Sequence, residues 1–424
     1  MNEKLLQFIW QFQYFSKQNL QTTEGETLLI EKPGQWNHHQ GPDFSEAVVR
    51  IGNTRWAGNI ELHLRSSDWM KHGHVNDVRY HNIILHVVWN DDEPLYDRTG
   101  NYVATLELQD RIPGLLLERY RQMMETLVAV PCRSFLPVLD QLNWTAWMER
   151  LAAERLQRKS GRILELFRQV NGHWEELTWW LLAANFGIRV NAGLFEWVAR
   201  ELPLVILARH RNNLQQLEAL LLGQANLLSG CYQEAYPKKL QSEYRYLRKK
   251  YKLHQPATQP AFLRMRPAAF PTVRLAQLAM LLHRNTTQFA FILEANSVHQ
   301  LVDHFMVTAS DYWNYHYRFD EETAVKPKQL GRQMAENILI NAVIPLLFTY
   351  GLYTNDESLK QRALQWLYEL PSEHNQITGS WQQSGIHHRC ALDSQALIEL
   401  TNLYCTHKRC LECAVGNRIL REGV

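Results

Sequence analysis

The sequence predicts an α+β protein, in which a small α/β sheet module is followed by a large all-helical region that ends in a cluster of cysteines. Two observations support this prediction. Apolar residues alternate with a period of two over the first quarter of the chain, and from Ile112 onward they recur at three- and four-residue spacings. Because 424 residues exceed what one hydrophobic core usually supports, we expect three domains, at 1–112, 113–255 and 256–424.

The N-terminal module is expected to contain one helix and five strands. Apolar residues between Glu3 and Tyr14 fit a helix, and the dipeptide Gly52-Asn53 predicts a tight hairpin turn. Period-two segments bounded by Gly, Asn and Asp predict strands at 27–32, 46–52, 54–64, 82–90 and 102–109.

The remainder is expected to be helical. Segments such as 147–167 and 214–228 carry the helical spacing of apolar residues, and no internal repeat indicates a solenoid. Proline-rich or polar stretches at 253–274, 318–332 and 371–390 are expected to separate the helices into sub-bundles.

Composition is typical of a folded protein without a general affinity for polyanions. Hydrophobic residues make up 46% of the chain and charged residues 21%, and 45 basic residues nearly balance 43 acidic ones. The first residues lack the pattern of a secretory signal, and the longest apolar run, Ile338 to Leu352, is short and contains Pro345. We therefore expect a cytoplasmic protein without a membrane partner.

A histidine- and carboxylate-rich cluster marks the N-terminal module. Seven of the 18 histidines fall between His38 and His86. In the expected strand 54–64, alternation places Glu61 and His63 on one face of the sheet. A hairpin would fold Asp43, which follows Gly41-Pro42, back toward Glu61, so the two carboxylates are expected to converge.

This pattern resembles the PD-(D/E)xK core of restriction endonucleases and RecB-type nucleases, in which Pro-Asp precedes a strand with an acidic residue, a spacer and Lys. The resemblance implies Asp43, Glu61 and His63 as catalytic residues, with the two carboxylates holding Mg²⁺ or Mn²⁺ for phosphodiester hydrolysis. His63 stands in place of the Lys and is a weaker fixed cation. The alternative is a non-catalytic nucleic-acid- or protein-binding scaffold that keeps the nuclease-like fold.

The histidines also support a second metal hypothesis. His72 and His74, with Asp77 and with His86 as a further candidate, have donor types that suit a transition metal in a hydrolase. The alternative is a structural role, in which these side chains form hydrogen bonds with buried backbone groups or cap turns.

A basic segment in the helical region is the candidate nucleic-acid surface. Residues 237–252 combine seven Lys or Arg with three tyrosines, and basic residues meet phosphates while tyrosines stack on bases. The same pattern fits a solvated helix face. The candidate contacts are Lys238, Lys239, Arg245, Arg248, Lys249, Arg266 and Arg274.

Three cysteines near the C-terminus have metal-ligand spacing. They read Cys405-x4-Cys410-x2-Cys413, which suits Zn²⁺ or an iron–sulfur cluster. The candidates for the fourth ligand are Cys390, which we place first, and His387, His388, His407, Cys132 and Cys231. One distant cysteine with three near the C-terminus resembles the arrangement in some RecB-type nucleases.

Several phrases resemble a bacterial protein family designated domain of unknown function 2851. They include GPDF, IELH, SSDW, ILHVV, EALLLGQANLL, RPAAFPTVRLAQLA and CLECAVGN, and they extend over nearly the whole chain. The resemblance implies one two-part architecture and no established activity, so a function has to be argued from the residues.

Overall fold

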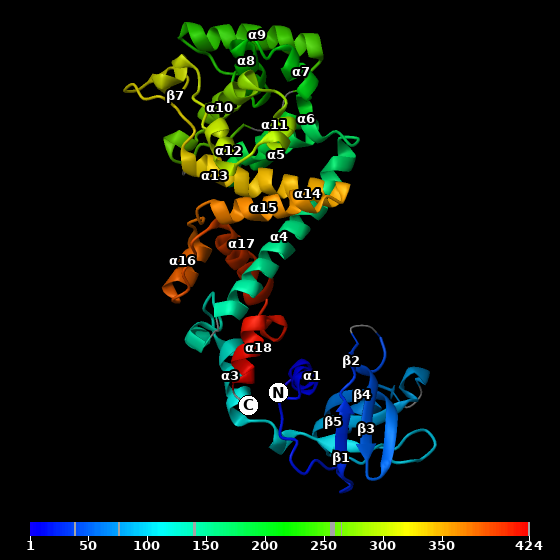
Figure 1. The fold of residues 1–424 in the computed structure, drawn as a ribbon. Helices are drawn as coiled ribbons and strands as arrows, with labels where there is room; N and C mark the ends of the chain where they lie inside the picture. The colour runs from blue at the N-terminus through cyan, green and yellow to red at the C-terminus, as the bar shows by residue number, and fades with distance from the viewer. Residues whose placement is uncertain (38–39, 75–76, 139–140, 255–258, 264, 423–424) are drawn as a thin grey trace. The chain divides into compact units, whose positions relative to one another are not determined.

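The structure is a computed structural model that describes residues 1–37, 40–74, 77–138, 141–254, 259–263 and 265–422 (Figure 1). The chain forms two compact units. The first contains Met1–Trp147, Ser380–Ile386 and Leu400–Val424, and the second contains Met148–Gly379 and His387–Glu399. Residues near the C-terminus therefore belong to the unit that carries the sheet.

The first unit is built on a mixed sheet of six strands (Figure 1). The strand order is β1-β3-β4-β5-β6, with β2 also paired to β3. β3 runs antiparallel to β1, β2 and β4, whereas β4, β5 and β6 are parallel. The strands are β1 (Leu28–Lys32), β2 (Gln35–Trp36), β3 (Phe44–Ile51), β4 (Thr54–Arg65), β5 (Ile83–Asn90) and β6 (Thr105–Glu107). An N-terminal sheet followed by a mostly helical remainder confirms the α+β class.

All five expected strands form, with changes at their ends. The hairpin occurs at Gly52, whose φ of 57° is a left-handed conformation that glycine adopts without strain. β6 is shorter than expected because Tyr102 pairs with Tyr96 in an isolated bridge. β2 has only two residues, too few for an alternating pattern to predict.

Helix α1 (Glu3–Phe12) packs against β4 through its apolar side. The Asn2 side chain accepts a hydrogen bond from the Leu5 N–H, and this cap fixes the start of the helix. The helix ends at Phe12, slightly before the expected Tyr14, and the capping residue Gln13 has a left-handed φ of 57°. Its buried residues are Leu5, Leu6, Phe8, Ile9 and Trp10.

The connection between parallel strands β4 and β5 contains α2 (Asp68–Lys71) and the 3₁₀ turn η2 (Val78–Tyr80). Parallel strands require such a crossover, which passes over one face of the sheet. The histidines of this connection are thereby brought near the side chains of β4.

Close packing of β4 against the start of β5 requires glycine at position 58. A Cβ atom there would lie 2.5 Å from Ile84 Cγ2 and 2.7 Å from the Asn82 carbonyl oxygen. We expect Gly58→Ala to lower the free energy of unfolding by about 1–3 kcal/mol, as overpacking does, in urea denaturation. Gly114→Ala is the matched control, because a Cβ there meets no atom within 4 Å. Equal stability of Gly58→Ala and wild type would contradict this account of the strand pairing.

The other helical elements follow from the apolar spacing. In the first unit they are α3 (Gly114–Glu125), the 3₁₀ turns η3 (Gln109–Arg111), η4 (Arg133–Val138) and η9 (Cys410–Glu412), the π-helical turn η8 (Leu400–Cys405), and α18 (Ala414–Arg421); α4 (Gln141–Gln169) begins in this unit and continues in the second. The second unit contains α5 (Trp174–Phe186), α6 (Ile188–Glu201), α7 (Leu204–Arg209), α8 (Leu214–Gln224), α9 (Ala235–Tyr251), α10 (Pro271–Arg284), α11 (Gln288–Glu294), α12 (Val298–Phe305), α13 (Arg332–Ile338), α14 (Ile344–Thr354), α15 (Glu357–Glu369) and α17 (Ala391–Glu399).

Two of the expected polar separators carry regular structure. The stretch 318–332 contains β8 (Glu321–Glu322), which pairs with β7 (His316–Arg318) in a small antiparallel sheet. The stretch 371–390 contains α16 (Gln376–Gln383), whose first turn is capped by the Asn375 side chain. Short elements of this kind lack a run long enough for periodicity to detect.

One helical run among the described residues is long and apolar enough to cross a membrane. It joins α13, the π-helical turn η7 (Leu339–Val343) and α14 over Arg332–Thr354, with a mean hydropathy of 1.4. Of this window, 72% is buried inside the protein, as in a core helix.

Candidate metal site in the N-terminal unit

The two carboxyl groups Asp43 and Glu61 lie together at one end of β3 and β4. The Asp43 N–H donates to Glu61 Oε2 at 2.9 Å, and the Leu62 N–H donates to Asp43 Oδ2 at 3.1 Å. Gln7 of α1 donates from Nε2 to Asp43 Oδ1 at 2.8 Å. These bonds fix both carboxyl groups in position, and Glu61 is only 5% exposed.

Three imidazoles gather next to Glu61. His63 Nε2 lies 3.8 Å and His74 Nε2 lies 3.5 Å from Glu61 Oε1. His63, His72 and His74 each offer a ligand nitrogen, and these nitrogens all lie within 4.8 Å of one another. We call these three residues the histidine trio. The histidine trio combines residues from the two metal sites predicted from the sequence. His63 comes from the nuclease-like pattern on β4, and His72 and His74 come from the histidine-rich crossover.

His86 is a hydrogen-bonding neighbour of His63. It is paired in register with Glu61 across β4 and β5, and it is fully buried. Its Nε2 lies 2.8 Å from His63 Nδ1, and His63 Nε2 in turn lies 3.1 Å from His72 Nδ1. With the proton on His63 Nδ1, the hydrogen bond to His86 Nε2 leaves His63 Nε2 directed toward His72. Outer-sphere partners orient metal-binding histidines in this way.

Asp77 has a different role from the one expected. Its side chain accepts the Arg79 N–H at the start of η2 and pairs with the Arg79 guanidinium at 2.5 Å. These bonds hold the pKa of the Asp77 carboxyl down at about 2. The structure therefore groups His72 and His74 with His63 rather than with Asp77.

Burial and crowding shift the pKa values of the site in opposite directions. Desolvation, with the neighbouring carboxylate, raises the pKa of Glu61 to about 9, and desolvation raises that of Asp43 to about 6. Desolvation lowers the pKa of His63 to about 2 and that of His86 to about 3. The carboxyl groups therefore resist ionisation, and the imidazoles beside them are neutral. A bound cation would stabilise the ionised carboxylates and bind the neutral imidazoles.

Three neighbours of this site, Glu3, Gln7 and Tyr80, were not predicted from the sequence. Glu3 lies one helical turn before Gln7 on α1, and it acts electrostatically on both carboxyl groups. The Tyr80 ring stacks on His74 with centroids 3.9 Å apart. A signal for the α1 residues was present, because Glu3 and Gln7 are polar residues four apart, which places them on the same face of a helix.

A pocket of about 600 Å³ borders His74. Trp56, which is 47% exposed, and Tyr80 contribute aromatic rings to its wall, and Arg98 contributes a cation. The same wall carries the carboxylates of Glu24, Glu26 and Asp97. A substrate can thus approach the trio beside aromatic surfaces, in a pocket of mixed charge.

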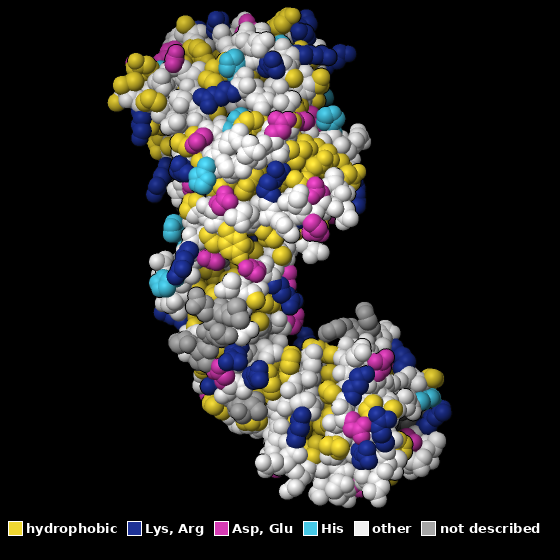
Figure 2. Space-filling model, in the orientation of Figure 1, with side chains coloured by type: hydrophobic (Ala, Val, Ile, Leu, Met, Phe, Trp, Pro, Cys, Tyr) yellow, Lys and Arg dark blue, Asp and Glu magenta, His cyan; other side chains and the backbone are white. Residues whose placement is uncertain are grey.

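The predicted nucleic-acid residues lie in the second unit and do not form one surface. Helix α9 buries Leu240, Tyr244 and Leu247, while its basic residues Lys238, Lys239, Arg245, Arg248 and Lys249 are exposed. Figure 2 shows Lys and Arg side chains at the end of this unit where α9 lies. Arg266 is also exposed, just before the 3₁₀ turn η5 (Pro267–Ala269). Tyr244 packs against Gly223 instead of offering a stacking surface.

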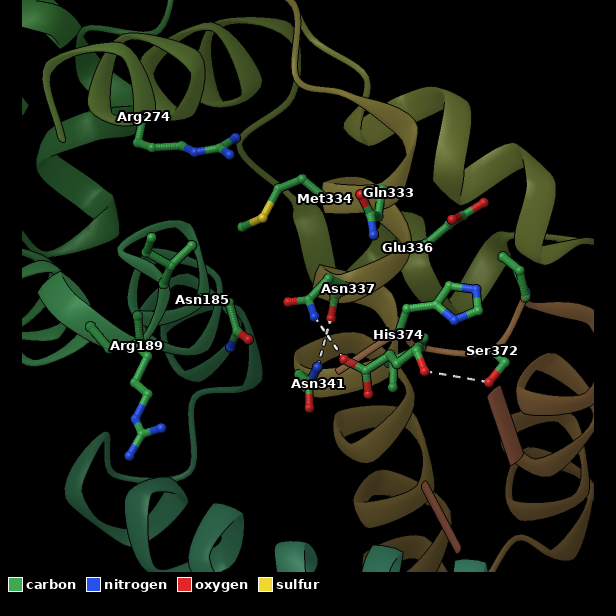
Figure 3. Close-up of a pocket in the computed structure, with 16 residues that line it drawn as sticks. Asn185, Arg189, Arg274, Gln333, Met334, Glu336, Asn337, Asn341, Ser372 and His374 are labelled. Carbon is green, nitrogen blue, oxygen red and sulfur yellow. Dashed lines mark hydrogen bonds between the residues drawn. The ribbon is translucent and has the colours of Figure 1, made fainter. Parts of the chain in front are cut away.

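Arg274 is placed differently, in the wall of a pocket of about 710 Å³ (Figure 3). It is 8% exposed, donates to Gln277 Oε1 at 3.1 Å, and burial lowers the pKa of its guanidinium to about 10. Asn337, Asn341 and His374 line the same pocket. Arg274 therefore lines a pocket of the second unit and is not part of the exposed face of α9.

The predicted C-terminal cysteines lie around one small cavity of the first unit, together with Cys132. Its wall includes Cys132, Cys405, Cys410 and Cys413. Cys390, the expected fourth ligand, lies in the second unit, where its N–H donates to Asp393 Oδ2 at 3.4 Å. Cys231 is exposed in the second unit.

Comparison with known proteins gives a family without an assigned activity. No curated protein and no solved structure matches the chain. One family model matches residues 3–376, which include the sheet, the metal-site residues and most of the helical region. The chain therefore belongs to the family described as protein of unknown function, DUF2851.

Proposed function

We propose that the N-terminal unit is a metal-dependent phosphodiesterase that acts on nucleic acid. One divalent cation would be held by Asp43, Glu61 and the histidine trio. The observation that supports this most strongly is the placement of three imidazole nitrogens within 4.8 Å of one another beside Glu61, with two of them 3.5 and 3.8 Å from the same carboxylate oxygen. The Asp-then-Glu arrangement on neighbouring strands supports a nuclease-like site.

The donor types favour a transition metal over Mg²⁺. Mg²⁺ selects oxygen ligands in octahedral geometry, whereas imidazole suits metals such as Mn²⁺, Fe²⁺ or Zn²⁺. The His74 Nε2 atom also fits a ligand role, because it is buried without a hydrogen-bond partner. We therefore expect Mn²⁺ or Zn²⁺ to support activity better than Mg²⁺.

The side chains have separate tasks in hydrolysis. A bound cation would supply an activated water and offset charge on the phosphate. Glu61 and Asp43, fixed by backbone and Gln7 hydrogen bonds, would hold such a cation in position. Burial lowers the pKa of His74, which favours the neutral imidazole that binds a metal through Nε2.

Nucleic acid is the substrate class that the surroundings support. Trp56 is an exposed ring in the pocket beside His74, and such rings stack on bases. The exposed basic residues of α9 provide a separate surface for phosphates on the same chain.

Cleavage of labelled single- and double-stranded DNA and RNA tests the proposal, with Mg²⁺, Mn²⁺ or Zn²⁺ added to metal-free protein. We expect Asp43→Asn to reduce the rate by about 100-fold or more, since even outer-sphere partners of a metal contribute about 10- to 100-fold. Glu46→Gln is the matched control, because Glu46 is an exposed carboxylate on β3 whose contacts are with Lys32 and Gln35.

Equal cleavage by wild type and Asp43→Asn would assign the activity to a contaminant or to another site. Absence of cleavage under every condition, with nucleic-acid binding retained, would replace the enzyme by the binding scaffold that the sequence also allows.

A further inference from the structure

Cys132 meets three C-terminal cysteines, Cys405, Cys410 and Cys413, at one place in the first unit. Cys132 precedes η4, Cys405 ends η8, Cys410 begins η9, and Cys413 precedes α18. All four line the same small cavity, together with Pro131, Tyr404, Arg409 and Gly416. None of the four is in a disulfide, although a disulfide would be a simple use of paired buried cysteines.

Two backbone N–H groups are directed at the Cys413 sulfur. Burial raises the pKa of this thiol to about 11, and the N–H groups of Gly416 and Val415, in the first turn of α18, donate to the sulfur and act in the opposite direction. Gly416 also allows a close turn, because a Cβ there would lie 2.0 Å from the Cys410 carbonyl oxygen. Backbone N–H groups directed at a cysteine sulfur tune thiolate-bound metals.

Cations lie near the cluster. Burial and the neighbouring Cys413 raise the pKa of the Cys410 thiol to about 12, and Lys408 acts in the opposite direction. Arg409 lines the cavity. Four thiolates around a divalent ion, or around a cluster of equal charge, leave a net negative charge that such residues offset. Thiols that line one cavity, backbone donors and nearby cations are the groups that a thiolate-bound metal requires.

We propose that Cys132, Cys405, Cys410 and Cys413 are the four thiolate ligands of one metal centre. Cys132, and not Cys390, supplies the fourth ligand, because Cys132 lines the cavity with the other three. This centre is separate from the histidine trio and does not depend on the function proposed for it.

The spacing of the sulfurs favours an iron–sulfur cluster over one zinc ion. Four thiolates about 2.3 Å from a tetrahedral zinc are only about 3.8 Å apart. Among the described residues, three ligand atoms within 4.8 Å of one another occur in the histidine trio and not among these four sulfurs. Thiolates that bind different iron atoms of a cluster lie farther apart than those on one ion.

The metal content of the full-length protein tests the proposal, after anaerobic purification from cells supplied with iron and zinc. We expect stoichiometric iron and sulfide with visible thiolate-to-iron absorption, lost more than fourfold per folded chain in Cys132→Ala. The matched controls Cys390→Ala and Cys231→Ala should retain the wild-type content. Circular dichroism checks folding of each variant.

X-ray absorption at the metal edge of wild-type protein gives a reading that does not depend on folding of a variant. A sulfur-only shell with iron–iron scattering would support both the site and the cluster. A sulfur-only shell of four around zinc would support the site and overturn the cluster. Nitrogen or oxygen in the shell, absence of metal, or full metal content in folded Cys132→Ala would overturn the four-cysteine site.

Discussion

In metal-free wild-type protein, the free energy of unfolding is expected to decrease between about pH 6.5 and pH 9 as Glu61 ionises. Glu61→Gln should not show this decrease. Burial raises the folded-state pKa of Glu61 from 4.5 to about 9. The stabilising effect of its protonated form is complete below pH 4.5 and is lost as the pH rises toward 9. One such group changes the free energy of unfolding by up to about 1.4 kcal/mol per pH unit.

The other site residues act at lower pH, which isolates this window. Asp43, with a pKa raised to about 6, completes its effect near that pH. His63 and His86 have lowered pKa values, so their contribution is present above pH 6.5 and is lost as the pH falls. Of Asp43, Glu61, His63 and His86, only Glu61 has a folded-state pKa that extends into the range between pH 6.5 and 9.

The measurement is the difference between wild type and Glu61→Gln in urea unfolding, with a chelator present, at several pH values. Taking a difference cancels other groups, notably Lys159 of the second unit, whose pKa burial lowers to about 7. Glu46→Gln should show no pH-dependent difference, since Glu46 is exposed. A flat difference between wild type and Glu61→Gln would mean that Glu61 ionises normally.

Added metal should prevent the decrease in stability at alkaline pH in wild type, and should have much less effect on Glu61→Gln. A cation that keeps Glu61 ionised would abolish the alkaline loss, and binding at 100 times Kd adds about 2.7 kcal/mol of stability. Glu61→Gln should gain much less from the same concentration of Mn²⁺ or Zn²⁺. Equal stabilisation of both proteins would place the bound metal elsewhere.

Local sequence pattern predicted the part of the site that lies on regular strands. Period-two alternation placed Glu61 and His63 on one face, and the turn at Gly52 brought Asp43 beside Glu61. These relations depend on strand geometry and on one hairpin, and both are encoded within about twenty residues.

The crossover and the cysteines depend on tertiary packing instead. His72 and His74 reach His63 only because the connection from β4 returns over the sheet, whereas Asp77 binds the nearby Arg79. Local capping bonds of this kind compete with a distant site and are hard to distinguish in sequence. Likewise, spacing identified Cys405, Cys410 and Cys413, but no local signal favours Cys132 over Cys390.

His63 has a different place in this site from the Lys of the nuclease pattern. A buried Lys would add a fixed charge, whereas His63 is neutral and bonds through both nitrogens to His86 and His72. A chain of imidazoles supplies metal ligands and proton acceptors. The substitution therefore changes the metal preference expected of the site, without by itself making the site inactive.

The second large effect is expected from the basic face of α9. Replacing Lys238, Lys239, Arg245, Arg248 and Lys249 together by Gln should weaken binding to DNA or RNA strongly at low salt. Each lost phosphate contact lowers the salt slope of the binding constant by about 0.9 on B-DNA, so five contacts correspond to a change of about 4 to 5. The helix should remain folded, because Leu240, Tyr244 and Leu247 on its other face are unchanged.

The matched control replaces five exposed basic residues elsewhere on the second unit by Gln: Arg162, Arg168, Lys326, Arg332 and Arg389. Binding is measured by fluorescence anisotropy of labelled oligonucleotides across a range of salt concentrations. If both variants lose the same affinity and slope, net charge and not α9 is responsible. If the α9 variant binds as wild type does, this face is an ordinary solvated surface, and recognition must come from the unit that holds the histidine trio.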